Sequence, residues 1–321
     1  MMDNRTYDFH LTAFANTTVN HLLLFFLFLS LYLTGILGNI IIVTSVIIDT
    51  RLHTPMYIFL SNLSSVDVIF NSSTLPKLMD ILLSGNDSIS FPQCFAQLFF
   101  YMLAASTEDV LLSVMAYDRY LAICKPLHYH LIMNRPQYAL LLLGTWVVGC
   151  VNSLFLTFSI YQLELCPATK IQHFFCDIKA LEKITCSHTQ FYILLYIESV
   201  VLGLFPFLLS LTSYIKIIRI VLKIKSTSGR RKAFSTCTSH LTVLMIFYGV
   251  ALCMYVKPPS VQFETQDLVF SIMYTAVTPM LNPLIYALRN KEVKSALKRI
   301  FGIRKNELQS GKIKQCHRAQ M

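Results

Sequence analysis

The sequence MAYDRYLAICKPLHY, residues 115–129, decides the fold because it places a charged pair where a long apolar run ends. Asp118 and Arg119 follow that run, and Pro126 ends the helix that the run predicts. Opposite charges attract far more strongly at the edge of a low-dielectric region than in water, so the pair can hold one conformation and release another. Alternatively, Arg119 extends to lipid headgroups, as interfacial basic side chains do. Both interpretations put this stretch at a membrane surface.

The composition of the chain is that of a membrane protein. Of its 321 residues, 55% are hydrophobic and 14% are charged, which leaves too little polar surface for a soluble globule. A membrane-spanning helix needs about 20 predominantly apolar residues. Runs of this kind cover residues 22–48, 56–83, 96–123, 138–161, 191–222, 236–256 and 268–288. We therefore predict an all-α membrane protein, a bundle of seven transmembrane helices.

The basic residues predict the orientation of the bundle, because short loops rich in Lys and Arg stay in the cytoplasm. With the N-terminus outside, most of the 27 Lys and Arg residues fall on the cytoplasmic side. The chain then divides into an extracellular tail (residues 1–21), a seven-transmembrane domain (22–288) and a cytoplasmic segment (289–321). The net charge of +10 belongs to the inner face, where it suits membrane lipids and an acidic cytosolic partner rather than nucleic acid.

Covalent modifications are expected on the outer side. Asn4 and Asn16 begin glycosylation sequons in the polar tail, and we expect the first span to act as its own anchor without a cleavable signal peptide. An oxidising exterior also favours pairing among the outer cysteines, although their spacing leaves three connectivities open. These cysteines are Cys94, Cys166, Cys176 and Cys186. A disulfide from the long outer loop to the third span would fix a lid over the mouth of the bundle.

Charged side chains inside the spans are costly and therefore informative. The carboxylates in these positions are Asp67, Glu108, Asp109 and Glu198. Helical spacing puts Glu108 on the same face as Tyr101, Met115 and Arg119, so this face must look into the bundle. Asp67 and Glu108 would share a proton or a sodium ion, because a cation relieves the repulsion of neighbouring carboxylates. A neutral, hydrogen-bonded polar core is the alternative. Asp109 points about 100 degrees away and receives no role.

Several further motifs occur in order along nearly the whole chain. They are Gly38-Asn39, LHTPMY at 52–57, SNLSSVD at 61–67, MAYDRYLAICKPLHY at 115–129, Trp146, HFFCD at 173–177, Ser213-Tyr214, KAFSTCTSHL at 232–241, FYG at 247–249 and PMLNPLIYALRN at 279–290. Together they resemble the rhodopsin-like G-protein-coupled receptors, and specifically the olfactory receptors. The three longest motifs are highly specific, and LHTPMY leans towards the tetrapod-type class.

The resemblance implies a receptor for a small volatile odorant that activates a heterotrimeric G protein of the stimulatory, olfactory type and raises cyclic AMP. Arg119, released from Asp118, would swing towards the inner tyrosines while the sixth helix moves outward. Pro283 would break the seventh helix and leave a polar hinge. The residues given this role are Asp118, Arg119, Tyr120, Tyr214, His240, Tyr248, Asn282, Pro283 and Tyr286. The resemblance also pairs Cys94 with Cys176 and Cys166 with Cys186.

Two cytoplasmic segments complete this expectation. The hydroxyl-rich cluster at 235–240 would begin the sixth helix and cap its end, with the basic residues 230–232 facing lipid or the partner. After Asn290, apolar residues at helical spacing predict a short amphipathic helix on the inner leaflet. Its apolar face holds Val293, Leu297, Ile300 and Phe301, opposite Lys291, Lys294 and Lys298.

The resemblance places the odorant in the outer half of the bundle, in an apolar cavity with few polar groups. The lining residues would be Tyr101, Met102, Ala105, Ser106, Glu198, Leu202, Leu252, Tyr255 and Thr275. Glu198 departs from the family's pattern. Its carboxylate would pair with a ligand amine, accept a hydroxyl's hydrogen bond, or instead bond a neighbouring helix. We hypothesise a preference for amines and other donor-bearing odorants.

Other functions fit the sequence less well. The main alternative is a non-olfactory receptor of the same class for a small ligand. A transporter or proton pathway would use the same carboxylates, but no inverted repeat is visible. No catalytic constellation, phosphate loop or metal motif indicates an enzyme, and no cofactor is expected beyond the sodium ion or proton at Asp67 and Glu108. We expect a multi-pass protein of the plasma membrane and, by the resemblance, of the cilia of olfactory sensory neurons.

Overall fold

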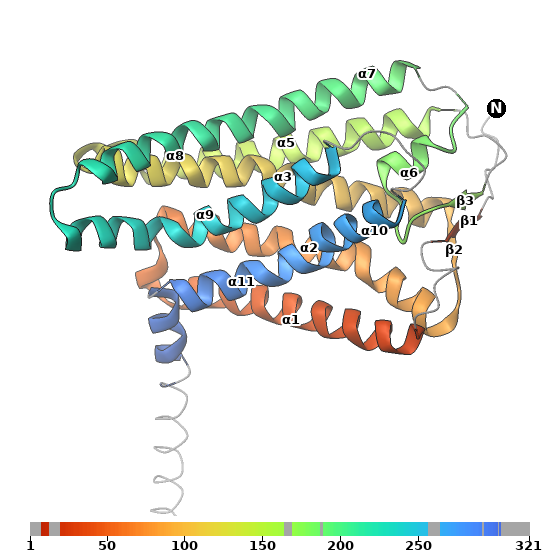
Figure 1. Cartoon of the computed structure of the whole chain (residues 1–321), viewed down its shortest axis with the longest axis horizontal. Coiled ribbons are helices and arrows are strands. Elements are labelled where there is room, and N and C mark those ends of the chain that lie inside the picture. Colours follow the sequence, from red (N-terminus) through yellow and green to blue (C-terminus); the bar gives the residue numbers. More distant parts are fainter. Residues whose placement is uncertain are drawn as a thin grey trace, which may run out of the picture.

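The computed structural model describes residues 8–12, 20–163, 169–186, 189–255, 264–290, 292–300 and 302. Its long helices run side by side as one bundle (Figure 1). They are α1 (His21–Ile48), α2 (Pro55–Ser84), α3 (Phe91–Cys124), α5 (Arg135–Tyr161), α7 (Thr189–Glu198) continuing into α8 (Phe205–Lys223), α9 (Thr227–Tyr255), and α10 (Glu264–Ile272) continuing into α11 (Thr278–Arg289). Each predicted span therefore corresponds to one of these helices or continuous helix pairs.

The fifth and seventh spans are each interrupted by a short π-helical segment. The first is Ser199–Leu204, between α7 and α8, and the second is Met273–Val277, between α10 and α11. Shorter elements complete the connections: 3₁₀ turns at Thr50–Leu52 and Pro126–His128, α4 (Tyr129–Ile132) and α6 (Ile178–Glu182). Because π-helical turns are rare and gather at functional sites, these two interruptions mark positions to examine.

The helices begin and end at residues suited to capping. Asn20 accepts a hydrogen bond from Leu22 N at 3.0 Å at the start of α1, and Asn134 accepts one from Gln137 N at 3.0 Å at the start of α5. At the start of α3, Ser90 and Gln93 form a capping box. Helix α2 ends at Ser84, and Gly85 follows it with a φ of 72°, a left-handed conformation that glycine adopts without strain.

The start of the sixth span differs from the prediction. Helix α9 begins at Thr227, well before the hydroxyl cluster at 235–240. Ser226 caps it, because its Oγ accepts a hydrogen bond from Gly229 N at 3.2 Å. Within the cluster, Thr238 Oγ1 instead donates to the Phe234 carbonyl at 2.6 Å, inside the helix. The expectation that this cluster caps the helix was wrong, because α9 extends into the cytoplasm beyond the apolar run.

Hydropathy alone recovers most of this bundle. Among the described residues, five helical stretches are long and apolar enough to cross a membrane, and Cys237–Cys253 is a shorter apolar stretch. Helix α2 has 30 residues, but Ser, Thr, Asn and Asp interrupt its apolar sequence. These polar residues are compatible with a membrane because several of them, including Asp67 and Asn71, are completely buried against other helices.

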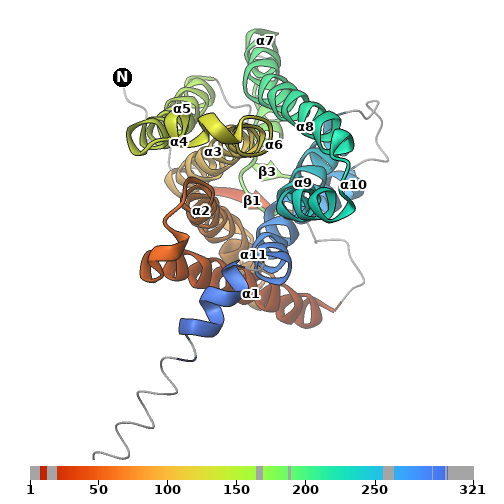
Figure 2. The same ribbon diagram turned by 90° about the vertical axis from the view of Figure 1, so that its left-hand side faces the viewer.

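A small sheet closes the outer end of the bundle. Strand β1 (Asp8–Leu11) lies between β2 (Ser88–Ser90), with which it is antiparallel, and β3 (Lys170–Ile171), with which it is parallel. Figure 2 looks along the bundle from the cytoplasmic end and shows β1 and β3 behind the middle of the ring of helices. The polar composition of the tail did not predict this strand.

The cytoplasmic segment after Asn290 begins as a helix, which covers residues 292–300. Val293 and Ala296 are buried against the inner ends of the other helices, whereas Lys294 and Lys298 are exposed. Lys291 and Phe301, also assigned to this helix, lie outside the described residues. Arg299 forms an ion pair with Asp49, with Nη2 and Oδ2 2.5 Å apart, and its guanidinium holds the pKa of Asp49 below the usual value.

Candidate functional site

The charged pair at the cytoplasmic end of α3 is closed and buried. Arg119 Nε donates to Asp118 Oδ2 at 3.0 Å, and Arg119 Nη2 donates to the same oxygen. The Tyr129 hydroxyl donates to the other carboxylate oxygen at 2.8 Å. Since only 8% of Arg119 is exposed, its side chain does not extend to lipid headgroups. Burial and the nearby carboxylate also raise the pKa of Tyr129.

Aromatic residues of α3, α8, α9 and α11 lie near this pair. The Tyr214 hydroxyl of α8 and His240 Nδ1 of α9 are hydrogen-bonded at 2.8 Å, which joins the fifth and sixth spans. Tyr286 of α11 is fully buried. Tyr120, next to Arg119, lies under the ammonium of Lys216, 5.3 Å from its ring centre. The predicted inner residues thus converge on one region between α3, α8, α9 and α11.

A polar layer crosses the middle of the bundle. Asn282 Nδ2 donates to both carboxylate oxygens of Asp67, each at 3.1 Å, and Pro283 follows within the same helix. Glu108 is close enough to Asp67 to interact with it electrostatically. Within the described part of the chain, Glu108 Oε1 and both polar side-chain atoms of Asn71 are buried without a hydrogen-bond partner. Such orphaned atoms are rare in proteins unless water or an ion satisfies them.

Asp109, to which the sequence assigned no role, contacts the sixth span. The Tyr248 hydroxyl of α9 donates to Asp109 Oδ1 at 2.9 Å, so this carboxylate connects the third and sixth spans. The Tyr248 ring also packs edge-on against Phe207 of α8, with ring centres 4.9 Å apart. Helical spacing showed that Asp109 leaves the face of Glu108, but only the packing of α9 against α3 showed what it meets.

Most of the residues assigned to the odorant site lie in the outer half of the bundle. Tyr101, Met102 and Ser106 are buried on α3, and Thr275 is buried in the second π-helical segment. Ala105 and Leu202 are half-buried. Leu252 differs, since 53% of it is exposed, so its side chain is not enclosed with the others. Nothing is described of the Tyr255 side chain.

Glu198 ends α7 immediately before the first π-helical segment. Its Oε1 accepts a hydrogen bond of 3.4 Å from Asn152 Nδ2 on α5. The same amide makes a shorter bond, 2.9 Å, to Ser106 Oγ on α3. A polar group shared by three spans therefore lies beside the predicted odorant residues. Asn152 was missed by the sequence analysis because an asparagine within an apolar span carries no motif.

A lid formed by residues 170–176 covers this region. A disulfide joins Cys176 to Cys94 of α3, and Cys176 N donates to Gln97 Oε1 at 2.8 Å. The rings of Phe175 and Tyr101 are 4.8 Å apart, and His173 Nε2 lies 3.1 Å from Ser271 Oγ of α10. The lid is thus fastened to the third and seventh spans.

The other predicted modifications fall partly outside this description. Cys186 takes part in a disulfide, but Cys166, its expected partner, lies outside the described residues. The sequons at Asn4 and Asn16 also lie outside them. The second pairing and the two glycosylation sites therefore stay predictions.

Comparison with known proteins gives a consistent result. A family described as "Olfactory receptor" matches residues 28–304. Olfactory receptor 1G1 of Gorilla gorilla gorilla is 43% identical over 298 residues, covering 92% of this chain and 95% of that protein. Olfactory receptor 1E16 of Mus musculus is 44% identical over 287 residues, covering 89% and 91%. Olfactory receptor 7C1 of Homo sapiens is 43% identical over 300 residues, covering 92% and 94%.

Proposed function

Because this chain belongs to the olfactory receptor family, we propose that it binds a small volatile odorant in the outer half of its bundle and activates a heterotrimeric G protein of the stimulatory, olfactory type. Cyclic AMP rises as a result. Members of the family are odorant receptors that couple to G proteins and are not enzymes. The observation that supports the proposed mechanism is the closed, buried pair of Asp118 and Arg119 at the cytoplasmic end of α3.

In the proposed mechanism this closed pair is the resting state. Odorant binding favours a state in which Arg119 leaves Asp118 and turns towards Tyr214 and Tyr286, while α9 moves outward. Several contacts among the described residues restrain α9 at rest, and the following are polar or aromatic. His240 bonds Tyr214, Tyr248 bonds Asp109, and the Tyr248 ring packs on Phe207. The outward movement must break or replace these contacts, so each contributes to the stability of the resting state.

The polar layer would transmit this change. Pro283 removes one hydrogen bond from the ladder of α11 and makes the helix easier to bend there. Asp67, Glu108 and Asn282 supply oxygens that suit a sodium ion, and Glu108 Oε1 is buried without a partner among the described residues. A bound sodium ion or shared proton would neutralise one of the two carboxylate charges and so relieve their repulsion. Asp67 would then hold Asn282 in its resting position through their two hydrogen bonds.

The chemistry of Glu198 supports donor-bearing odorants as the ligand class. Asp67 receives two hydrogen bonds and Asp109 receives a short one from Tyr248. Among the described residues, Glu198 accepts a long hydrogen bond of 3.4 Å from Asn152, whose amide makes its shorter bond to Ser106. A carboxylate in a low-dielectric region is costly unless it is paired or hydrogen-bonded. A ligand ammonium or hydroxyl would supply the missing bond, so we propose amines first and alcohols second.

The location follows from the same proposal. The chain is a multi-pass membrane protein, and we place it in the plasma membrane of the cilia of olfactory sensory neurons. Its inner leaflet would contact the helix at residues 292–300, whose exposed Lys294 and Lys298 suit anionic lipid headgroups.

Cyclic AMP accumulation tests the proposal. Cells co-expressing the receptor and a stimulatory G protein are exposed to amines, alcohols and esters, with Arg119→Ala in parallel and surface expression matched. We expect an odorant-dependent rise that Arg119→Ala abolishes. A response that survives the substitution would contradict the mechanism at Arg119. Silence towards every odorant, at confirmed surface expression, would contradict the proposed ligand class or coupling partner.

A further inference from the structure

Strand β1 is part of the outer core, although it belongs to a polar tail. Phe9 and Leu11 are only 2% and 1% exposed, and both belong to the apolar cluster that fills the outer half of the bundle. The Phe9 ring stacks on Phe91 at the start of α3, with ring centres 5.9 Å apart. A tail residue reaches such burial only when the surrounding structure holds a place for it.

Backbone hydrogen bonds fix β1 between two outer loops. Leu11 N donates to the Asp87 carbonyl at 3.0 Å on one side. On the other side, His10 N donates to Thr169 O at 2.8 Å and Thr12 N to Ile171 O at 2.9 Å. In the sheet β2 and β3 are joined through β1 and not to each other. Without β1, the segment 169–171 would lose these two bonds at the root of the lid.

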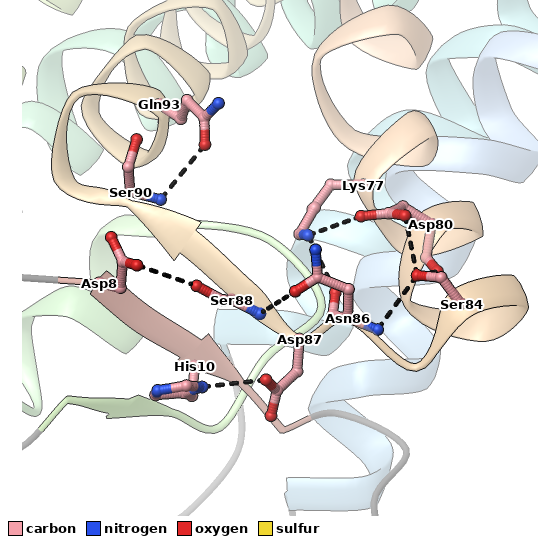
Figure 3. A network of polar contacts seen from close by, with 10 residues as sticks. All are labelled: Asp8, His10, Lys77, Asp80, Ser84, Asn86, Asp87, Ser88, Ser90 and Gln93. Atoms are coloured by element: carbon pink, nitrogen blue, oxygen red, sulfur yellow. Dashed lines mark hydrogen bonds and ion pairs between the residues drawn. The ribbon is translucent and has the colours of Figure 1, made fainter.

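Side chains at the exposed edge of the sheet add polar contacts (Figure 3). His10 Nδ1 lies 2.9 Å from Asp87 Oδ1, and Ser88 Oγ donates to Asp8 Oδ2 at 3.3 Å. Lys77 of α2 donates to the Asn86 carbonyl and so connects this loop to α2, and it also pairs with Asp80 of the same helix. Exposed pairs of this kind contribute little to stability, so the buried side chains and the backbone bonds must hold β1 in place.

A continuous path leads from β1 to the odorant site. Strand β3 ends at Ile171, and His173, Phe175 and Cys176 of the lid follow within five residues of it. Phe175 packs on Tyr101, one of the residues assigned to the odorant. Phe9 and Ile171 belong to the same apolar cluster as Phe175 and Tyr101. The position of the lid over the site therefore depends on β1 as well as on the disulfide and the Gln97 bond to α3 and on His173 at α10.

We propose that β1 holds the lid in place over the odorant site and that the buried side chain of Phe9 anchors β1. Docked β1 holds the lid against Tyr101 and slows the exit of odorant. Undocking would release only the β3 end of the lid, because the disulfide still holds Cys176 to α3. This inference rests on the proposed function, and it concerns how long the odorant stays rather than which one binds.

The first test is the decay of the cyclic AMP signal after rapid washout of odorant. We expect Phe9→Ala to speed this decay several-fold and to raise the half-maximal odorant concentration, and Phe9→Leu to restore most of the loss. The maximal response per surface receptor should not change. The matched control is Phe26→Ala, which removes a phenyl ring from the 58% exposed, lipid-facing surface of α1.

A second variant keeps the test valid if Phe9→Ala does not reach the surface. His10 lies directly opposite Ser88. Leu11 and Asp87 form the neighbouring pair and are hydrogen-bonded, so His10 and Ser88 form a non-hydrogen-bonded pair. The Cα atoms of such a pair are about 4.5 Å apart. That separation suits a disulfide. The double variant His10→Cys with Ser88→Cys should therefore slow the decay several-fold relative to either single variant.

The outcomes distinguish a failure of the role of β1 from a failure of the proposed function. An odorant response in the unmodified receptor, with the same washout decay in Phe9→Ala and in the crosslinked receptor, would overturn the role of β1 and leave the proposed function intact. Absence of any odorant response in the unmodified receptor would count against the proposed function itself, and against this inference with it.

Discussion

Asp109 and Glu198 are both carboxylates inside the bundle, yet their surroundings give them different roles. Asp109 is bonded by the Tyr248 hydroxyl at 2.9 Å, so its hydrogen-bonding capacity serves the contact between α3 and α9. Glu198 has one long bond from Asn152. The periodicity within one helix places both carboxylates in the interior. It cannot show which of them is better hydrogen-bonded, because the donors come from other helices.

Glu198→Gln should weaken the response to amines selectively. The substitution removes the negative charge but keeps the shape of the side chain. A hydrogen bond to a charged group contributes roughly 1.5–3 kcal/mol, so we expect the half-maximal concentration of an alkylamine to rise about tenfold or more. An alcohol of the same chain length should change far less. Dose-response curves for the two compounds measure this difference.

The control for this substitution is Asp80→Asn, the same chemical change at the exposed outer end of α2, where Asp80 pairs with Lys77. Equal shifts for amine and alcohol in Glu198→Gln, or no shift in either, would argue against Glu198 as the group that selects the ligand.

At the scale of the helices, the notable features are the two π-helical interruptions and the contacts at the inner end of the bundle. The first π-helical segment begins directly after Glu198, and the second contains Thr275. Both residues are predicted to line the odorant site, and π-helical turns often lie at functional sites. At the inner end, the helix at residues 292–300 is held by Arg299 on Asp49. Tyr57 adds a hydrogen bond of 2.7 Å to Glu292 Oε2. These contacts connect α1, α2 and the cytoplasmic helix.

Asp49→Asn should lower the thermal stability of the purified receptor at neutral pH. Arg299 lowers the pKa of Asp49 in the folded state. The stabilisation is therefore complete above the unfolded value of 3.8 and is lost only as the pH falls through the lower folded value. The thermal stability should then not depend on the titration of Asp49 across the cytosolic pH range.

Thermal melts of Asp49→Asn, Arg299→Ala and the double variant test this ion pair. We expect the losses of stability to be non-additive, because the two side chains interact. Strictly additive losses would show that they do not interact.

At the scale of the whole molecule, the interior consists of two apolar clusters, one outer and one inner, with the polar layer of Asp67, Asn71 and Glu108 buried in the bundle as well. The outer cluster includes Phe9 and Leu11 of the tail together with residues of the lid and of the extracellular halves of the helices. The inner cluster includes Tyr214 and Tyr286. Packed apolar regions resist continuous deformation, so we expect the bundle to bend at the polar layer and at Pro283 of α11.

Cys94→Ser should destabilise the receptor as a whole. The disulfide joins residues separated by 82 positions, and closing a loop of that length stabilises a fold by about 4 kcal/mol in the chain-entropy model. We expect a clearly lower Tm for the purified protein and less receptor at the cell surface. Cys150→Ser, which removes a free cysteine of α5, is the matched control. An unchanged Tm in Cys94→Ser would show that the other fastenings of the lid suffice.

The sequence by itself determined the class of structure and the family. The spacing of apolar runs and the distribution of basic residues depend on local composition and on the thickness of a bilayer, so they predicted the seven spans and the orientation without knowledge of packing. The ordered motifs around Asp118 and Asn282 were also readable, because each is a short continuous stretch.

Only the tertiary structure decided which distant residues meet. It paired Tyr248 with Asp109 and Asn152 with Glu198, placed Phe9 in the outer core, and began α9 at Thr227 rather than at the hydroxyl cluster. It also left Leu252 exposed. The physical reason is the same in each case. These outcomes depend on the rotation and packing of one helix or strand against another, and periodicity within a single segment does not contain that information.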